Sequence, residues 1–171
     1  MQLQFKNILL RDATKADAKQ LAAWWNDGAV MAHAGFPLGL GKTEQEVAAG
    51  VRKGLLILEE NGKPIGEANY KVVREGIAEI GIKICIVECQ NRGVGRMALS
   101  MLIRYLFDVG FQKVVLDTNL ANKRAQHVYE SLGFRKLRVN RDSWTDQLGR
   151  LQSSVDYALE KEDFVDYTLN A

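Results

Sequence analysis

The hexapeptide Gln90-Asn91-Arg92-Gly93-Val94-Gly95 lies between an apolar, strand-like run and an amphipathic helical pattern. Its glycines allow the backbone to approach a ligand closely. A helix that begins behind them presents unpaired N–H groups and the positive end of its dipole. These features predict an anion site, most often for a phosphate, and the molecule that carries the phosphate decides the function.

Turn and capping signals divide the chain upstream of the hexapeptide. Thr43-Glu44-Gln45-Glu46 has the pattern of a helix capping box. Asn61-Gly62 and Glu75-Gly76 are turn dipeptides between β-rich runs, so three successive antiparallel strands are predicted. The predicted upstream elements are a strand at Ile8–Arg11, a helix from Thr14 to about Asp27-Gly28, a long loop at 29–42, a helix from Thr43 to Gly54, and strands at Leu55–Glu59, Ile65–Val73 and Ile77–Ile86.

Downstream of the hexapeptide, helices and strands alternate. A helix that ends at Gly110 separates the fourth predicted strand from the fifth, and this order favours parallel pairing of those two strands. The fold class is therefore α+β: a mixed central sheet with antiparallel N-terminal strands and a parallel fourth and fifth strand, flanked by helices, in a single domain over residues 1–171. The predicted downstream elements are the helix after Gly95, a strand at Lys113–Thr118, a helix from Asn122 to Gly133, and strands at Lys136–Asn140 and Ser153–Leu159.

The composition of the chain limits which partners, which cellular compartment and which metal sites are expected. The 23 basic and 21 acidic side chains leave a net charge of +2, which favours neither a nucleic-acid nor a membrane partner. Residues 1–6 lack the apolar core of a secretory signal, so a cytoplasmic location is predicted. Two close cysteines, Cys85 and Cys89, and two histidines make no metal-ligand pattern, and no metal is expected.

A dinucleotide site is the first alternative for the phosphate ligand. Residues 93–98 fit the dinucleotide fingerprint, and Asp117 has the spacing of a ribose ligand. However, polar residues 88–92 separate the first glycine from its strand, and hairpin strands precede the loop. Neither feature suits an alternating parallel fold.

Two motifs together resemble one family. Gln90-x-x-Gly93-x-Gly95 is similar to the acetyl-CoA loop of the GCN5-related N-acetyltransferases (GNAT), and residues 122–134 are similar to that superfamily's second motif. The order of elements agrees over residues 8–160, and the general pattern resembles the branch that contains ribosomal-protein N-terminal acetyltransferases. The resemblance implies an N-acetyltransferase that transfers an acetyl group from acetyl-CoA to a primary amine, by direct attack through a tetrahedral intermediate.

The resemblance also implies a donor site. Amides from Asn91 to Arg96 would hold the CoA pyrophosphate, and Arg92 and Arg96 would add positive charge or remain solvated cations at the helix start. The end of the fourth strand, Ile84 to Val87, would pair its backbone with the pantetheine amides, so Cys85 needs no reactive role. Asn122 would bond to the cofactor arm, cap its helix, or do both. The predicted donor-site residues are Ile84, Cys85, Ile86, Val87, Gln90, Asn91, Arg92, Gly93, Val94, Gly95, Arg96, Asn119, Asn122 and Tyr129.

Two residues are catalytic candidates. Tyr129 matches the family tyrosine near the CoA sulfur that is proposed as general acid; the alternative is a buried aromatic whose hydroxyl bonds to a neighbour. Glu79 shares a strand face with Lys83 and Cys85, opposite an isoleucine face, and would serve as general base. The alternative for Glu79 is a solvent-side strand glutamate, and Glu67 is a less favoured base.

The acceptor site is predicted outside the cofactor motifs. Trp24, Glu79 and Trp144 are the candidates, together with the glycine-rich loop at 31–42 and the turn that contains Asp146 and Gln147. Trp25 is expected in the core, and Asp146 either attracts a cationic amine or only shapes its turn. The acceptor is a small-molecule amine or a peptide N-terminus, and a homodimer through the last strands is possible. A non-catalytic acyl-CoA-binding regulatory module is the alternative function.

Overall fold

A computed structural model describes residues 1–169, which form one eight-stranded sheet in the order β1-β2-β3-β4-β5-β6-β8-β7. Among these residues, no helix is long and apolar enough to cross a bilayer. The strands are β1 (Gln2–Phe5), β2 (Ile8–Asp12), β3 (Leu55–Glu60), β4 (Lys63–Arg74), β5 (Ile77–Ile84), β6 (Lys113–Asn119), β7 (Arg135–Thr145) and β8 (Leu151–Glu160). The α-helices are α1 (Ala18–Trp25), α2 (Gly28–Met31), α3 (Glu44–Gly50), α4 (Val94–Asp108) and α5 (Lys123–Ser131).

The predicted fold class is confirmed, with a shift in strand numbering. Every neighbouring pair in the sheet is antiparallel except β5 and β6, which are the fourth and fifth strands of the sequence prediction. The shift arises because β1 was not predicted. That strand is only four residues long, and its Leu3 and Phe5 pack against the core only partly buried, so its alternation is too short to stand out.

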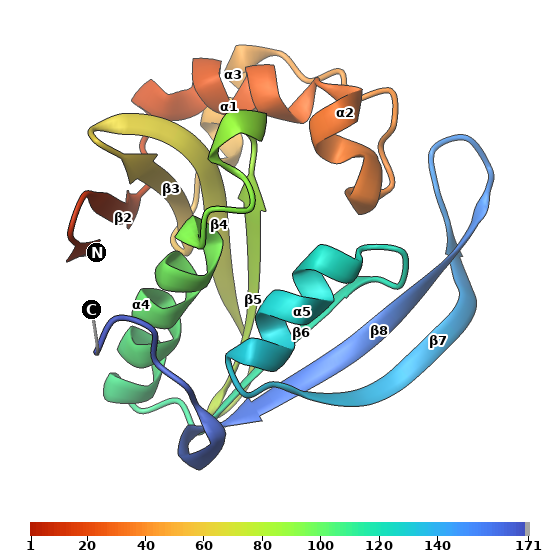
Figure 1. Ribbon diagram of the computed structural model, residues 1–171. Helices are drawn as coiled ribbons and strands as arrows, with labels where there is room; N and C mark the ends of the chain where they lie inside the picture. The colour runs from red at the N-terminus through yellow and green to blue at the C-terminus, as the bar shows by residue number, and fades with distance from the viewer. Residues whose placement is uncertain (170–171) are drawn as a thin grey trace.

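Helices cover both faces of the sheet and create two cores. α4 and α5 pack on one face with the larger core, while α1 and α3 cover the other face with a smaller one (Figure 1). The continuously apolar sequence of β3 is explained by its position between the two cores. Leu56 and Leu58 point into the larger core, and Leu55 and Ile57 point into the smaller core. A strand buried on both faces needs no polar alternation.

Capping signals were reliable, but the exact helix ends were not. The Thr43 hydroxyl accepts from the Glu46 amide at 3.2 Å and the Glu46 carboxylate from the Thr43 amide at 2.8 Å, which confirms the predicted capping box. The predicted loop at 29–42 is partly wrong, because α2 and a 3-10 turn occupy residues 28–34. The Asp27 carboxylate accepts from the Ala29 amide at 2.8 Å and starts α2 locally.

The sheet splits at its parallel pair. β5 and β6 pair only from Ile77 to Glu79 on one strand and from Lys113 to Val115 on the other. Beyond these residues the strands separate, and α5 lies in front of the gap (Figure 1). The split leaves the β6-facing edge of β5 without a strand partner from residue 80 onward. This split between β5 and β6 determines where the candidate active site lies.

Candidate active site

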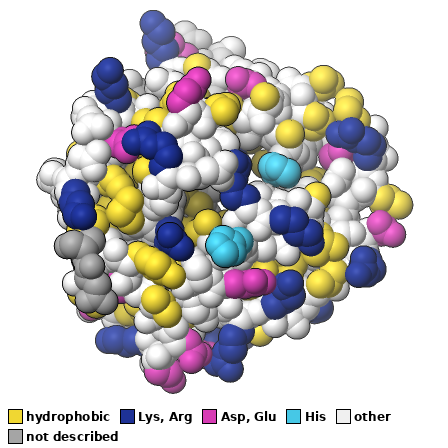
Figure 2. Space-filling view, viewed as in Figure 1, with side chains coloured by type: hydrophobic (Ala, Val, Ile, Leu, Met, Phe, Trp, Pro, Cys, Tyr) yellow, Lys and Arg dark blue, Asp and Glu magenta, His cyan; other side chains and the backbone are white. Residues whose placement is uncertain are grey.

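A cavity of about 980 Å³ fills the split between β5 and β6. The open face of the molecule is hollowed, and both histidines of the chain, cyan in Figure 2, lie on it. The walls come from α2, β4, β5, the loop before α4, β6, α5 and the hairpin between β7 and β8. The predicted donor-site residues that line it are Ile84, Cys85, Val87, Gln90, Asn91, Gly93, Val94, Gly95, Arg96, Asn119, Asn122 and Tyr129.

The glycine loop and the start of α4 form one end of the cavity. Asn91 and Gly93 have φ angles of 58° and 79°, in the left-handed region, so the chain turns sharply before α4 begins at Val94. The first amides of a helix have no partner within it, and here they lie at the cavity wall. Arg96 also lines the cavity, with its guanidinium 4.2 Å from the Tyr167 ring centroid. This end has the charge and geometry for a phosphate.

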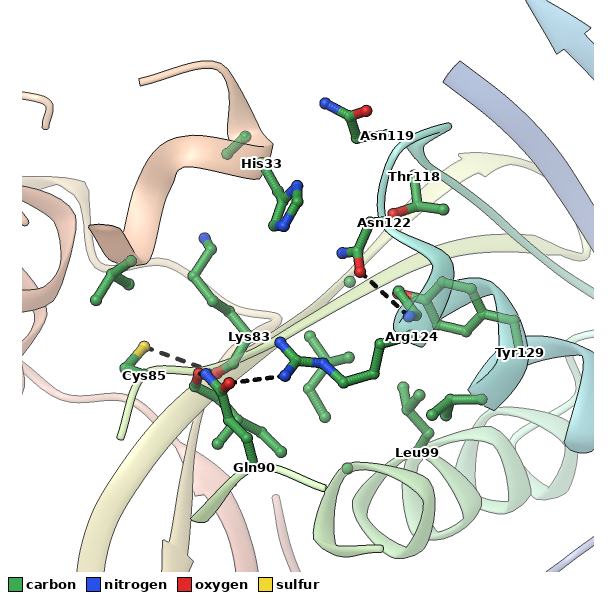
Figure 3. Close-up of a pocket in the computed structure, with 18 of the residues that line it drawn as sticks. His33, Lys83, Cys85, Gln90, Leu99, Thr118, Asn119, Asn122, Arg124 and Tyr129 are labelled. Atoms are coloured by element: carbon green, nitrogen blue, oxygen red, sulfur yellow. Dashed lines mark hydrogen bonds between the residues drawn. The ribbon is translucent and has the colours of Figure 1, made fainter. Parts of the chain in front are cut away.

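Gln90 connects the two sides of the split. Its side-chain amide donates to the Ile84 carbonyl at 2.9 Å, and its oxygen accepts from the Arg124 guanidinium at 2.8 Å. Figure 3 shows the Arg124 side chain, from α5, reaching across the cavity to Gln90. Gln90 therefore holds the end of β5 beside α5, a role that the motif resemblance did not indicate.

Two residues of the predicted donor site point elsewhere. Arg92 does not line the cavity, because its guanidinium makes two hydrogen bonds, at 3.0 and 3.1 Å, to the Glu60 carboxylate. Ile86 does not line it either and packs against the larger core. The amides of Ile86 and Cys85 both donate to the Ile65 carbonyl. Both bonds are made to β4, so the pairing of residues 84–87 with pantetheine on the opposite edge stays a prediction.

Asn122 and Asn119 differ in what their side chains leave free. The Asn122 side-chain oxygen accepts from the Ala125 amide at 3.2 Å, so Asn122 caps α5. The side-chain nitrogen of Asn122 makes no hydrogen bond with the described residues. The Asn119 side chain accepts from the Ala121 amide at 2.9 Å and donates to Gln152 at 3.3 Å. Asn122 thus keeps a donor available at the cavity, whereas Asn119 uses both of its groups within the protein.

Tyr129 lines the cavity from α5 with only 6% of its surface exposed. Its ring packs between Phe134 and Tyr157, with centroids at 5.9 and 6.0 Å. Its hydroxyl makes no hydrogen bond with residues 1–169, and no fully enclosed side-chain polar atom among them lacks a partner. The hydroxyl therefore opens into the cavity. Burial, and secondly the Asp117 carboxylate, raise the pKa of Tyr129 to about 12, so it stays protonated at neutral pH.

A buried carboxylate, Glu67, also lines the cavity. Glu67 lies on β4, is 6% exposed, and is the cross-strand partner of Lys83 on β5. One oxygen, Oε1, accepts from the Trp25 indole at 3.0 Å and from the Lys83 ammonium at 3.2 Å. The other, Oε2, accepts no hydrogen bond within residues 1–169, yet it is not fully enclosed. It is therefore open to a ligand.

Glu79, the predicted base, does not line the cavity. It is the last residue of β5 that pairs with β6, so it lies where the split begins. Its side chain is 35% exposed and forms an ion pair with Lys71 at 2.9 Å. Residues 81–84 of β5, from both faces of the strand, line the cavity, so Glu79 lies before the segment that does so.

Both neighbouring tryptophans contact the smaller core. Trp24, the acceptor candidate, is 4% exposed and belongs to that core. Trp25, which was expected in the core, packs against it partly buried, and its indole donates to Glu67. Trp144, the other candidate, lines the cavity. The carboxylate of Asp146 accepts hydrogen bonds only from its own hairpin, so it shapes its turn.

Several cavity residues were missed by sequence reasoning. Arg124 and His127 lie within the second motif at 122–134 and His33 within the glycine-rich loop at 31–42, but none of them was singled out there; the other four lie far apart in the chain. Lys83 was noted only as a face neighbour, and Asp117 only as a ribose ligand. The missed residues that line the cavity are Asp27, His33, Asn69, Lys83, Asp117, Arg124 and His127.

Cys85 is expected to be inert although it lines the cavity. Burial, and then the Glu67 carboxylate, raise the pKa of its thiol to about 12, so almost no thiolate exists at pH 8. Alkylation of the folded protein with iodoacetamide at pH 8, followed by mass spectrometry, should leave Cys85 unmodified, whereas the urea-unfolded chain should react fully. Fast labelling of Cys85 in the folded state would contradict this assignment.

Comparison with known proteins agrees with this geometry. The family model described as "Acetyltransferase (GNAT) domain" matches residues 7–135. Mycothiol acetyltransferase from Thermomonospora curvata is 32% identical over 87 residues, which are 51% of this chain and 29% of that protein. The chain thus spans less than a third of this curated relative. A second, uncharacterized protein from Methanocaldococcus jannaschii is 28% identical over 52% of this chain and 19% of its own length.

Solved structures show the same fold. A GNAT-family acetyltransferase from Bacillus anthracis has a TM-score of 0.81 at 19% identity, covering 95% of this chain and 99% of that one. A putative acetyltransferase from Salmonella typhimurium, solved with its cofactor acetyl-CoA, has a TM-score of 0.75 at 23% identity, covering 90% and 94%. The fold, the two motifs and the family match agree: this chain belongs to the GNAT acetyltransferase family.

Proposed function

We propose that this protein is an acetyl-CoA-dependent N-acetyltransferase that acetylates a primary amine by direct attack on the thioester. The observation that carries the proposal is the cavity in the split sheet, whose wall contains both the start of α4, which suits an anion, and the buried carboxylate of Glu67. The family supplies the donor class. The acceptor, the branch within the family and a homodimer remain predictions.

The donor fits the end formed by the glycine loop. The amides at the start of α4 and the cationic side chains of Arg96 and Arg124 suit the pyrophosphate. The open edge of β5 from residue 80 to 84 offers backbone groups to the two amides of pantetheine, which would lie along it like an added strand. The free amide of Asn122 faces the same arm. Bound acetyl-CoA supplies the acetyl group in activated thioester form.

Glu67 is the general base of the proposal. An alkylamine with a pKa of about 10.4 is almost entirely protonated at pH 7, so a group must accept its proton before attack. The Oε2 atom of Glu67 is open to the cavity, while Trp25 and Lys83 fix the carboxylate through Oε1. A carboxylate held in one orientation accepts a proton without reorganising at the moment of reaction.

Tyr129 is the group that stabilises the leaving sulfur. Its pKa of about 12 lies above the value of about 8.5 typical of a thiol, so complete proton transfer from tyrosine to thiolate is unfavourable. A hydrogen bond from the Tyr129 hydroxyl to the sulfur as negative charge develops needs no such transfer. As the C–S bond breaks, the nitrogen releases its second proton to the reaction medium, and the departing sulfur takes a proton from the medium.

Acetyl-CoA binding and turnover test this function directly. At about 100 times its dissociation constant, acetyl-CoA is expected to add about 2.7 kcal/mol to the free energy of unfolding. Release of CoA thiol from acetyl-CoA, followed with a panel of primary amines, should show turnover. Stabilisation without turnover of any amine would favour the regulatory binding module. Stabilisation by a nicotinamide dinucleotide instead would contradict the proposal.

A further inference from the structure

The tip of the hairpin between β7 and β8 is bonded to the loop that follows α2. Gln147 makes all three hydrogen bonds: its amide donates to the Gly35 carbonyl at 2.8 Å, its side-chain nitrogen donates to the Gly39 carbonyl at 2.9 Å, and its side-chain oxygen accepts from the Leu38 amide at 2.9 Å. We call Gln147 with these three partners the latch. It joins segments more than 100 residues apart on opposite sides of the split.

The hairpin side of the latch is fixed by Asp146. Its carboxylate, almost fully buried, accepts from the amides of Leu148 and Arg150 at 2.9 and 3.0 Å. It also accepts from the Arg150 guanidinium at 2.8 Å and from the Gln152 side chain at 3.0 Å. Four hydrogen bonds on one carboxylate hold the turn in one shape, so Gln147 is presented to the loop in a fixed orientation.

The loop side is fixed as well. The Asn26 side chain donates to the Lys42 carbonyl and accepts from the Lys42 amide, both at 2.8 Å, and so closes the loop at its far end. A Cβ on Gly39 would lie 2.1 Å from the Asn26 carbonyl, so the loop backbone packs directly on the end of α1. Although the loop is rich in glycine, hydrogen bonds to Asn26 at one end and to Gln147 at the other hold it in place.

The latch places Trp144 in the cavity wall. The Trp144 ring lies against Gly35, where a Cβ would come within 2.5 Å of it and where φ is +95°. Only glycine suits this backbone conformation and this approach. His33 and Ala34 line the cavity just before Gly35. The latch therefore closes the wall at which α2 and the hairpin meet.

We infer that the latch restricts the acceptor to a small primary amine and excludes the N-terminus of a polypeptide. The inference rests on the proposed function, since it concerns the acceptor of the same site. The cavity of about 980 Å³ must hold the acyl-pantetheine arm as well as the acceptor, and α2, β4 and Trp144 form part of its wall. Asp27 and Glu67 also line it and suit a compact cationic group. Because the latch joins the loop after α2 to the hairpin, a peptide chain that follows the amine cannot leave the cavity between these two elements.

Gln147→Ala removes both side-chain hydrogen bonds of the latch and leaves its backbone bond. We expect KM for small amines to rise about tenfold, on the scale of two neutral hydrogen bonds, with KM for acetyl-CoA unchanged. We also expect the kcat/KM ratio of a tripeptide to a small amine to increase. The matched control is Leu148→Ala, which alters an exposed side chain of the same turn and should change neither constant.

Hydrogen exchange checks the latch without activity. The Leu38 amide should be protected in the wild type and in Leu148→Ala, and should lose protection in Gln147→Ala. An unprotected Leu38 amide in the wild type would overturn the inference. So would wild-type acetylation of the tripeptide as efficiently as of small amines, which would leave the proposed function standing. Absence of CoA release with every acceptor would overturn the proposed function and the inference with it.

Discussion

Glu67→Gln is expected to lower kcat for amine acetylation by about 100-fold or more at pH 7, the usual contribution of a general base. Glutamine keeps the shape of the side chain and can still accept from Trp25 and Lys83, but it does not take up the proton of the incoming ammonium. The loss should appear in kcat, with KM for acetyl-CoA little changed, because the proposed role of Glu67 is to take a proton from the acceptor amine.

The pH dependence of this variant separates a base from a merely structural residue. Without a base, the reaction depends on amine that is already neutral, and that fraction rises about tenfold per pH unit below the amine pKa of about 10.4. The rate of Glu67→Gln should therefore rise by about tenfold per unit from pH 7 to 9 and approach the wild-type rate. Glu79→Gln is the matched control and should keep the wild-type rate. Full activity of Glu67→Gln at pH 7 would remove Glu67 from the mechanism.

Tyr129→Phe is expected to lower kcat by about 100-fold, the scale observed when one hydrogen-bond donor to developing charge is removed. The substitution keeps the ring contacts with Phe134 and Tyr157 and removes a hydroxyl that bonds to none of the described residues. Stability at pH 7 should therefore not fall. Tyr157→Phe is the control: its hydroxyl donates to Glu130 at 2.9 Å, so that variant should lose about 1 kcal/mol of stability and keep its activity.

Alkaline unfolding provides a second measurement on Tyr129. The pKa of Tyr129 is raised to about 12 in the folded protein, whereas a tyrosine in the unfolded chain ionises near 10. Between these values the unfolded state loses its proton first, so the stabilisation that is complete below pH 10 decreases as pH rises towards 12. Urea unfolding at pH 9, 10 and 11 should show a shallower decline for Tyr129→Phe than for the wild type. Equal slopes would show that the hydroxyl is not buried as described.

Most of the predicted donor-site residues line the cavity, because their sequence signals are local. Gly93, Asn122 and Tyr129 lie within two short motifs, and each motif lies at the start of a helix whose periodicity is clear. Arg92 is the exception, since nothing near it in sequence shows that Glu60 would pair with it. A motif gives the path of the backbone more reliably than the direction of a long side chain.

Of the predicted acceptor residues, Trp144 lines the cavity and Trp24 and Glu79 do not, because their positions depend on strand and helix register. Strand alternation correctly grouped Glu79 with Lys83 on one face, but the length of the β5 and β6 pairing decides which of them lines the cavity. Alternation also does not show that Glu67 lies opposite Lys83. For Trp24 and Trp25, a rotation of one helical position exchanges a core residue for one that bonds to Glu67.

Because β5 and β6 pair over only three residues, the two halves of the sheet can rotate relative to each other about that short pairing, which acts as a pivot. Four residues beyond Glu79, a point on β5 lies about 13 Å from that pivot, so a rotation of about 5° would displace it by about 1 Å. Misplacement by 1 Å is enough to cost about 100-fold in rate. Gln147 connects the two halves far from the pivot, where a given rotation produces the largest displacement. The same three hydrogen bonds made beside the pivot would restrain this motion far less.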